Sequence, residues 1–384
     1  MGKHPDVAII GGGVIGLTTA YYLAREGVSV QLFDRSELGT EASWAGAGII
    51  PPGNLSRAAT AYDRLRASSS ETFPSLSAEL REQTGIDNGY RVCGGIEVFG
   101  EHAEESTRLW EAEGIEFLPP LRFGEGNRGG EVCLLEPQLR LPPGSAYHLP
   151  GMAQVRNPWH IRALVAACES IGVKLFTQTP IIRMQASGNR IQSAINESGI
   201  EHQAGNYLFA SGAWTDRLLS PLGIRTGVHP VRGQIVLFRP SQPLLRRIVN
   251  IDKQYLVPRE DGRILAGSTE EPEAGFEKRT TEAGINGLIR FATELVPALA
   301  SAPIEKTWAG LRPGSMDGLP YLGRLPGFEN AYVAAGHFRA GIQLSPATAR
   351  VMCELLTDRI PSIPLDDFRV NRPPSPLKAA AFRS

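Results

Sequence analysis

The chain has few cysteines and no long apolar run. Its 384 residues include only four cysteines (Cys93, Cys133, Cys168 and Cys353), and none forms a CxxC pair or stands at metal-ligand spacing from a histidine. Scattered cysteines of this kind are typical of small core side chains in a reducing cytosol, and we expect no metal. No apolar run approaches the ~20 residues that cross a bilayer. The polar start Met1–Asp6 leads straight into an apolar segment, so we expect no signal peptide and a cytoplasmic protein.

The sequence also lacks an excess of charge of either sign. The formal net charge is -1, which gives no field for attracting nucleic acid or an anionic membrane. We therefore expect a small-molecule substrate, with another copy of the chain as the only macromolecular partner. Hydrophobic residues make up 42%, as in an ordinary globular protein, and the length favours two domains.

The N-terminal segment has the pattern of a βαβ unit. Val7–Ile10 is a short apolar run, typical of a strand buried on both faces. Glycines follow, then helical spacing of apolar residues over Val14–Arg25, which Gly27 ends. Val28–Phe33 is predicted as a second strand, and Asp34 closes it.

The glycines between the first strand and the helix fit the G-x-G-x-x-G pattern of dinucleotide-binding folds. Gly11 allows the tight turn, Gly13 lets the backbone approach a pyrophosphate, and Gly16 lets the helix pack on the strand. The helix N-terminus offers free N–H groups to the phosphates. Asp34 stands where an acid hydrogen-bonds an unphosphorylated ribose, which favours FAD or NAD over NADP. The pattern alone does not choose between FAD and NAD.

Further elements are expected along the chain. Both ends and the middle have an α/β pattern, whereas two inserted blocks have the pattern of antiparallel strands. Strands are predicted over 91–99, 173–176, 181–184, 190–196, 205–210, 233–238, 254–258, 263–267 and 331–335, and helices over 71–85, 158–172, 280–296 and 345–356. A stretch rich in glycine and proline runs from about 118 to 151. Residues from Asp366 onward are expected to be a loosely held tail whose basic side chains, such as Arg372, are solvated.

Four further stretches resemble the D-amino-acid oxidase (DAO) superfamily, and within it the glycine oxidase family. They are the small-residue segment Gly39–Ile50, Phe209–Trp214, the pair Trp308–Gly314 with Asp317–Gly323, and Ala335–Ile342. The resemblance covers roughly residues 5 to 360 with the motifs in family order. It implies non-covalent FAD, hydride transfer from the carbon that bears the amine, and reoxidation by oxygen.

The resemblance also implies a two-domain fold. An α/β, Rossmann-like FAD-binding domain of the DAO (GR2) type would comprise residues 1–85, 146–224 and 306–365. A substrate domain, built as an antiparallel sheet over the flavin, would comprise 86–145 and 225–305, with 366–384 as the tail. Relatives include homotetramers, so a homo-oligomer is a further expectation.

The expected FAD-binding residues come from the dinucleotide pattern and from the matching stretches. They are Gly11, Gly13, Val14, Ile15, Gly16, Asp34, Arg35, Ser43, Ala45, Ala47, Gly48, Ile49, Ile181, Ser211, Gly212, Trp214, Gly310, Arg312, His337, Phe338, Arg339, Gly341 and Ile342.

Arg312 and Tyr255 are the first candidates for the substrate. An arginine suits the carboxylate of an amino acid, because two parallel charge-assisted bonds fix its orientation and offset its desolvation. Arg312 matches the family's carboxylate-binding arginine, with a structural ion pair as the alternative. Tyr255 stands at the family's active-site tyrosine and would donate to the same carboxylate, with an ordinary strand aromatic as the alternative.

Arg339 and Glu270 complete the candidates. The resemblance places Arg339 near the substrate, but the same loop passes the flavin, so both roles stay open. His337 is not expected to act as a base, because hydride transfer from a neutral amine needs none. Glu270 replaces a methionine that lines the pocket in the best-known relative. It would repel an anionic substrate, pair with its ammonium group, pair with a nearby arginine, or point to solvent with Glu271.

The leading hypothesis is an FAD-dependent amino-acid oxidase. Glycine would be the first substrate, giving glyoxylate, ammonia and hydrogen peroxide in thiamine biosynthesis. A D-amino-acid oxidase, a sarcosine or secondary-amine oxidase, and a dehydrogenase of the same fold that reduces a quinone remain alternatives. A nicotinamide dehydrogenase and a non-catalytic FAD-binding module are the readings from other classes.

Overall fold

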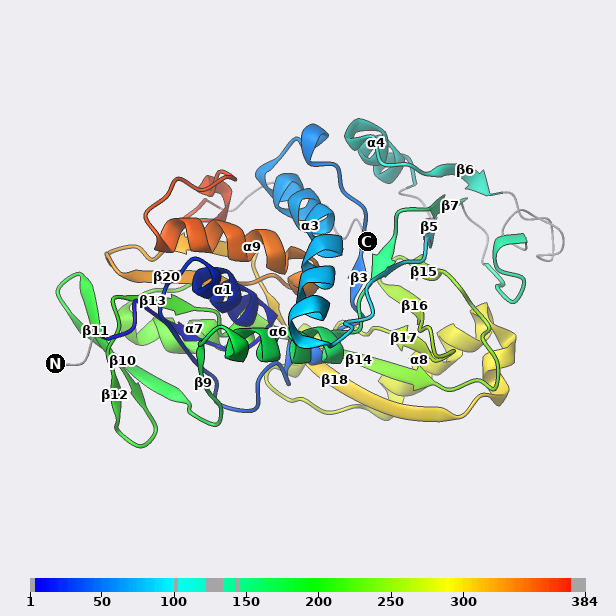
Figure 1. Ribbon diagram of the computed structural model, residues 1–384. Helices are drawn as coiled ribbons and strands as arrows, with labels where there is room; N and C mark the ends of the chain where they lie inside the picture. The colour runs from blue at the N-terminus through cyan, green and yellow to red at the C-terminus, as the bar shows by residue number, and fades with distance from the viewer. Residues whose placement is uncertain (1–3, 100–102, 122–133, 142–144, 374–384) are drawn as a thin grey trace.

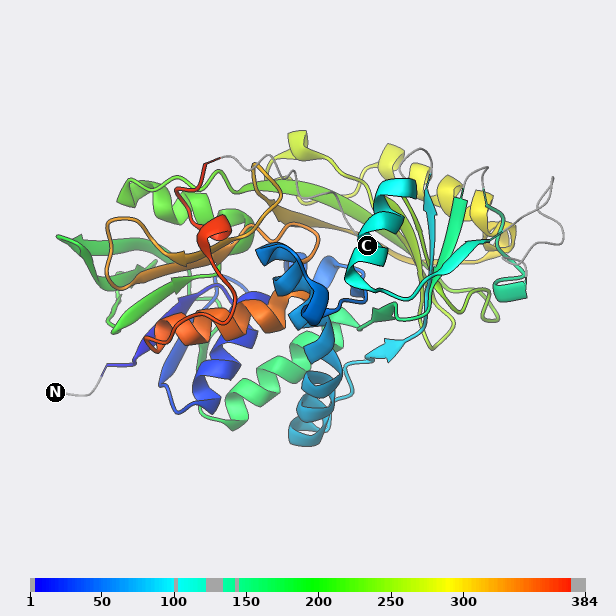
Figure 2. The ribbon, with the colours of Figure 1, turned by 90° about the horizontal axis from the view of Figure 1, so that it is seen from above.

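The computed structural model describes residues 4–99, 103–121, 134–141 and 145–373. Two large sheets organise the chain. One is a mainly parallel six-stranded sheet and the other a mainly antiparallel eight-stranded sheet. The first, with its helices, forms one end of an elongated molecule, and the second forms the other end (Figures 1 and 2).

The six-stranded sheet has the order β19-β20-β13-β1-β2-β9, and only β19 runs antiparallel to its neighbour. Its strands are β1 (Val7–Ile10), β2 (Val30–Phe33), β9 (Lys174–Phe176), β13 (Asn206–Phe209), β19 (Tyr321–Arg324) and β20 (Ala331–Ala335). All four residues of β1 are buried, as expected for a strand covered on both faces.

Alternate side chains of β1 pack into two different cores, because successive residues of a strand point to opposite faces. Val7 and Ile9 join a core formed with four helices, whereas Ala8 and Ile10 join a core on the opposite face. The helices are α1 (Val14–Arg25), α3 (Ala61–Thr84), α6 (Asn157–Ser170) and α9 (Gly341–Leu356). The opposite face is covered by α7 (Thr215–Leu219) and by the antiparallel strands β10 (Ile181–Ser187), β11 (Arg190–Asn196) and β12 (Glu201–His202).

The eight-stranded sheet has the order β18-β14-β17-β16-β15-β5-β7-β6, with β15 and β5 as its one parallel pair. Its strands are β5 (Gly95–Phe99), β6 (Leu118–Leu121), β7 (Ser145–Leu149), β14 (His229–Phe238), β15 (Ile248–Ile251), β16 (Gln254–Pro258), β17 (Ile264–Gly267) and β18 (Ile304–Gly314). Helix α8 (Glu282–Leu295) covers one face, and α4 (Ala103–Glu113) reaches the other through Trp110.

A small antiparallel sheet lies where the chain passes between the two large ones. It pairs β8 (Ala153–Gln154) with β3 (Ile49–Ile50) and with β4 (Arg91–Val92). β3 forms the end of the small-residue segment, which also contains the short helix α2 (Ala42–Ala45). This arrangement brings that segment beside the eight-stranded sheet, and the Trp308 indole of β18 donates to the Ala45 carbonyl at 3.0 Å.

Helix α3 begins ten residues before the predicted start. Thr60 caps it, and its side chain and that of Asp63 form a reciprocal capping box. The serines near its middle hide the helical pattern because they are buried and polar. Ser69 Oγ, for example, accepts the Ala347 amide of α9 at 3.0 Å. The strand predicted over 91–99 is divided by Gly94, whose φ of +73° interrupts it.

The expected boundary between 305 and 306 falls inside β18, which pairs with β14 along its length. Likewise, the boundary between 145 and 146 falls inside β7. In the sequence, Trp308–Gly314 is interpreted as a family motif that contains Arg312. The sequence pattern does not predict that this segment is part of a strand.

The expectation of a loosely held tail is wrong for residues 366–373. The Phe368 side chain is fully buried. The Arg372 side chain is 4% exposed and forms two bonds to the Asp317 carboxylate, at 2.7 and 2.8 Å. Arg372 and Asp317 therefore form a structural ion pair that holds the tail against the segment Asp317–Pro320. The expectation that Arg372 is solvated is wrong. Residues 374–384 lie outside the described part of the chain.

Candidate active site

The turn between β1 and α1 is built by glycines that tolerate no side chain. Gly11 has φ +117°, and a Cβ there would lie 2.3 Å from the Ala210 carbonyl oxygen. A Cβ at Gly16 would lie 1.9 Å from the Gly11 carbonyl oxygen, so the helix packs on the strand only with glycine there. The N-cap residue of α1, Gly13, has no side chain to cap the helix, and no acidic residue stands in the first turn. The positive dipole end of α1 is therefore available to a phosphate.

This turn opens onto a cavity of about 470 Å³. Of the residues predicted to bind FAD, all but Gly16 line it. Gly16 lies behind the turn, where it sets the packing of α1. The cavity also extends to Tyr255, Arg312 and Arg339, so the nucleotide turn and the candidate substrate residues share one space.

Asp34 is fixed at the edge of this cavity by local hydrogen bonds. Its Oδ2 accepts the Gly12 amide at 2.7 Å and its Oδ1 accepts the Ser36 amide at 2.9 Å. Burial raises the pKa of Asp34, and these backbone bonds oppose that shift. The neighbouring Arg35 lies over the Trp214 ring, with 3.6 Å between the guanidinium carbon and the ring centroid.

The small-residue segment forms another wall of the cavity. Gly48 has φ +74°, and a Cβ there would lie 2.2 Å from the Val155 carbonyl oxygen. The Val14 amide at the start of α1 donates to Ser43 Oγ at 2.9 Å. Across the cavity, Ser211 Oγ is buried and no residue in the described ranges accepts or donates a bond to it. A buried hydroxyl and a glycine-lined wall fit a bound nucleotide that supplies the missing partner.

Arg312 lies on β18 with neutral acceptors around its guanidinium. Its Nη1 donates to the Thr269 carbonyl at 3.1 Å and its Nη2 donates to Ser268 Oγ at 2.6 Å. Gly233 of the neighbouring strand makes room, because a Cβ there would lie 2.1 Å from Nη1. Within the described residues, no carboxylate lies at ion-pair distance from Arg312, so the alternative of a structural ion pair does not fit. Its charge is thus left to attract an anion.

The electrostatics of Arg312 are those of a desolvated cation. Burial lowers its pKa, and the positive charge of Arg339 acts in the same direction. Tyr255 and the negative charge of Glu270 oppose the shift. The Tyr255 ring lies against Gly267, where a Cβ would come within 2.6 Å of the tyrosine oxygen. Tyr255 is therefore held beside the guanidinium by a strand position that only glycine allows.

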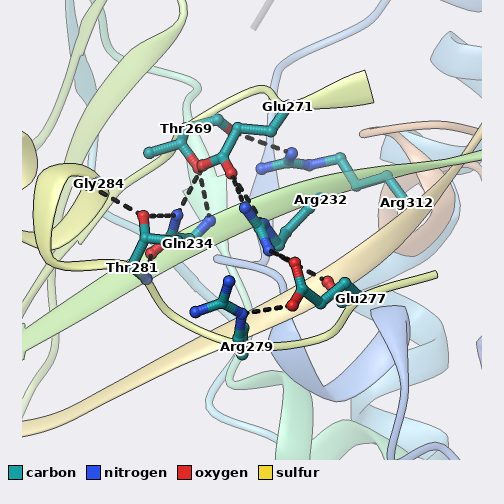
Figure 3. A network of polar contacts seen from close by, with 9 residues as sticks. All are labelled: Arg232, Gln234, Thr269, Glu271, Glu277, Arg279, Thr281, Gly284 and Arg312. Atoms are coloured by element: carbon teal, nitrogen blue, oxygen red, sulfur yellow. Dashed lines mark hydrogen bonds and ion pairs between the residues drawn. The ribbon is translucent and has the colours of Figure 1, made fainter. Parts of the chain in front are cut away.

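A network of polar contacts anchors the segment that carries the acceptors of Arg312 (Figure 3). Arg232 on β14 donates through Nε to the Glu271 carboxylate at 2.8 Å, and Gln234 Nε2 donates to the same carboxylate at 2.6 Å. The backbone amide of Gln234 donates to Thr269 Oγ1 at 3.0 Å. Figure 3 shows Arg312 reaching toward Thr269, beside the contact between Arg232 and Glu271. The network thus fixes the backbone that holds the guanidinium.

Glu270 does not point to solvent, and Glu271 belongs to the network. Glu270 Oε2 lies 2.7 Å from Arg339 Nη2, and its Oε1 lies 2.9 Å from Lys253 Nζ. Partial burial raises the pKa of Glu270, but the bond from Lys253 and the charges of Arg339 and Arg312 outweigh it, so the net shift is downward. Of the alternatives for Glu270, the structure shows pairing with an arginine. Glu270 itself lines a second pocket beside the main cavity.

His337 is not placed to accept a proton from a substrate. It is 3% exposed, and its Nε2 lies 3.1 Å from Thr348 Oγ1 of α9. Burial lowers its pKa to about 3, so the ring is neutral at physiological pH. The loop that contains it reaches β18 through the Phe338 amide, which donates to the Pro313 carbonyl at 2.9 Å.

Two groups of residues around the site were not predicted. Arg259 donates to the Ala47 carbonyl at 2.7 Å and to Gln154 at 2.7 Å, and so ties the small-residue segment to β16 and β8. Ser268 and Thr269 hold Arg312. The only feature of the sequence that could have indicated Ser268 and Thr269 is that they precede Glu270. Nothing in the sequence pattern indicated that they face β18.

The fold and this cavity define a class of protein. Residues 6–355 match the family described as FAD dependent oxidoreductase (DAO), and the chain belongs to that family. FAD is therefore the cofactor of the nucleotide turn, and the nicotinamide alternative is excluded. Metal-ligand clusters are absent from the described residues, and no helix among them is long and apolar enough to cross a membrane.

Within the family the chain is similar in sequence and structure to glycine oxidases. It is 36% identical over 358 residues to glycine oxidase from Pseudomonas aeruginosa, covering 93% of this chain and 96% of that protein. The crystal structure of glycine oxidase from Geobacillus kaustophilus has a TM-score of 0.88 at 32% identity, covering 97% of this chain and 100% of that one. Iminodiacetate oxidase from Chelativorans sp. BNC1 has a TM-score of 0.83 at 26% identity, covering 95% and 98%.

Proposed function

We propose that this enzyme oxidises the amine of a small amino acid, with glycine as its first substrate. The observation that carries the proposal is the guanidinium of Arg312, which has no carboxylate at ion-pair distance among the described residues and lies in the same cavity as the nucleotide-binding turn. The similarity to glycine oxidases over most of the chain supports the choice of glycine. The overall reaction would be glycine, oxygen and water giving glyoxylate, ammonia and hydrogen peroxide, and we place it in thiamine biosynthesis.

Three groups of residues would hold the cofactor. The α1 N-terminus with Gly11 and Gly13 would bind the pyrophosphate, and Asp34 would bind the ribose. The segment around Ser43–Gly48, with the 337–342 loop, would line the flavin ring. When bound, FAD supplies a two-electron acceptor for the hydride of the carbon that bears the amine.

The protein's own contribution is orientation. Arg312 would receive the substrate carboxylate through two parallel charge-assisted bonds, in place of its present neutral acceptors. Tyr255 would donate to the same carboxylate while its ring covers the site. His337 stays neutral and bonded to Thr348, so the proton balance of the amine is left to solvent. Positioning of this kind supplies much of the rate in such reactions.

A substrate panel tests this proposal. The purified yellow protein is given glycine, sarcosine, D-amino acids and cyclic amino acids in air, and hydrogen peroxide is measured. We expect peroxide release that is fastest with glycine. Faster release with sarcosine or a D-amino acid would move the proposal to one of the other amine oxidases. Turnover under argon with a dye, without oxygen uptake in air, would show a dehydrogenase and contradict oxygen as the acceptor.

We also propose a division into two domains, adjusted to the strand pairing. β7 and β18 would join the substrate domain, because both pair within the eight-stranded sheet. The FAD-binding domain would keep the strands of the six-stranded sheet and the helices that cover it. A homo-oligomer remains part of the proposal, and sedimentation of the purified protein would test it.

A further inference from the structure

The wall of the main cavity contains an ion pair that the proposed reaction does not use. Arg339 lines the main cavity, and Glu270, its partner at 2.7 Å, lines the neighbouring pocket. Asp252, Lys253, Gln254 and Ser268 line both spaces. The ion pair between Arg339 and Glu270 therefore lies at the boundary between the main cavity and the neighbouring pocket.

Arg312 and Arg339 are in opposite electrostatic states. Arg312 donates to a carbonyl and a hydroxyl, whereas Arg339 donates through Nη2 to the carboxylate of Glu270. The Arg339 side chain is 10% exposed and that of Glu270 is 25% exposed, so solvent screens this pair only in part. Both charges act on the guanidinium of Arg312, which places all three groups within one local field.

An anion entering this field meets one open cationic site and one that is already neutralised. A first carboxylate finds Arg312. A second carboxylate on the same molecule would have to displace Glu270 from Arg339, or lie beside the Glu270 carboxylate and be repelled. Lys253 bonds the other oxygen of Glu270 and helps to keep the glutamate in place.

We propose that Glu270 is a specificity-determining residue that occupies Arg339 and so restricts the site to substrates with a single carboxylate. The inference deepens the proposed function and rests on it, because it assumes that Arg312 receives the substrate carboxylate. It gives the substrate class as monocarboxylic amines, such as glycine or sarcosine, and excludes amines with two carboxylates. Removal of the charge at Glu270 takes this carboxylate partner from Arg339, so that a second carboxylate can bind there.

Ligand binding to the flavin-containing protein tests the inference without turnover. Acetate is compared with the unreactive dicarboxylates malonate, succinate and glutarate, which differ in length by one methylene group each, and binding is followed by calorimetry. In the wild type we expect no dicarboxylate to bind more tightly than acetate. In Glu270→Gln we expect the best dicarboxylate to gain about ten- to a hundredfold over acetate, as for one new charge-assisted bond.

Two further variants make the result specific. Glu294→Gln removes the same charge from the same neighbouring pocket, but Glu294 is exposed and has no bond to Arg339, so we expect no gain. Glu270→Gln combined with Arg339→Gln should lose the gain again. If Glu270→Gln does not retain flavin, Glu270→Met replaces it in the same comparison.

Several outcomes overturn the inference. They are a wild type that already prefers a dicarboxylate, a neutral variant at 270 with no gain, a gain that persists in the double variant, or an equal gain in Glu294→Gln. Activity is measured in parallel with glycine and iminodiacetate, and we expect the kcat/KM ratio to shift toward iminodiacetate by the same factor. A wild type that oxidises no amine would refute the proposed function, while the binding series would still decide the role of Glu270.

Discussion

In the turn that joins β1 to α1, residues of one short segment (Gly11, Gly13, Val14 and Ile15) line the cavity, whereas the wall around Arg312 depends on side chains far apart in the chain. Gly11 and Gly16 act by lacking a Cβ, and their contacts are with backbone atoms. Arg232 and Glu271 stand 39 residues apart, and Glu270 and Arg339 stand 69 apart. The turn therefore depends on glycine at fixed positions, and the wall depends on matched charges.

The largest effect is expected from a side chain in the turn. In Gly16→Ala, the new Cβ would lie 1.9 Å from the Gly11 carbonyl oxygen, and a backbone atom has little room to give way. We expect the variant to retain no flavin or to be insoluble. The measurement is the ratio of flavin to protein absorbance after purification, with circular dichroism as the test of folding.

Gly287→Ala is the matched control for this substitution. Gly287 lies within α8, where an added Cβ would meet nothing within 4 Å. We expect full flavin content and a gain in stability of up to about 1 kcal/mol, the ordinary difference between alanine and glycine in a helix. A Gly16→Ala protein with full flavin content would show that the turn tolerates more than its geometry allows.

The next largest effect is expected at Arg312, the residue that we propose binds the substrate carboxylate. Arg312→Met removes both bonds to the carboxylate, each worth about 1.5–3 kcal/mol, so kcat/KM with the best substrate should fall about 10²- to 10⁴-fold. Arg312→Lys keeps the charge but loses the parallel pair of bonds, and should fall by a smaller factor. Steady-state kinetics check both variants. Equal activity of the methionine variant and the wild type would refute the assignment of Arg312.

A smaller effect is expected from the network that supports Arg312. Glu271→Gln weakens the bonds from Arg232 and Gln234, and the Glu271 side chain is 27% exposed, so solvent screens part of the loss. We expect about a tenfold fall in kcat/KM, as for a guanidinium displaced by its supporting backbone. Glu277→Gln is the control, because Glu277 is 51% exposed and its bond to Arg232 is longer, at 3.2 Å. Equal falls in both variants would contradict the positioning role of Glu271.

The same contrast explains which parts of the site could be predicted from the sequence. The glycines, Asp34 and the helix that follows are consecutive, so their spacing alone carried the geometry of the turn. Arg312, Tyr255 and Arg339 were identified through family motifs and not through spacing. The roles of Ser268, Thr269 and Gln234 could not be predicted. They arise only when β14 pairs with β18 and the 268–281 segment folds back on β14.

Elements with buried polar faces were also missed or shortened. The start of α3 lacked an apolar pattern, since its serines pack against α9 as hydrogen-bonding groups. Arg372 looked like a solvated tail residue because nothing in the sequence marks its distant partner, Asp317. Long-range pairing of polar residues leaves no periodic trace, whereas apolar alternation and glycine spacing do.

The smallest effect separates the two regions by their response to acid. His160 of α6 is fully buried, and burial lowers its pKa from 6.5 to about 4. A histidine depressed in this way contributes stability that is complete above pH 6.5 and is lost as the pH falls toward 4. Glu271 in the wall has its pKa lowered from 4.5, although partial burial opposes the shift, so its contribution is lost only below about pH 4.5. Between pH 7 and pH 5 the nucleotide region should lose stability while the wall keeps it.

His160→Gln measures this difference. The variant has no titrating group at 160, so its stability deficit relative to the wild type should shrink by about 2 kcal/mol between pH 7 and pH 5, a span of about 1.5 pH units below 6.5. Urea unfolding at both pH values gives the two deficits. For Glu271→Gln the deficit should be the same at both pH values, because neither lies below the ordinary pKa of glutamate. If the His160→Gln deficit were equally constant, acid sensitivity would have to arise from another buried histidine such as His337, whose pKa is also lowered by burial.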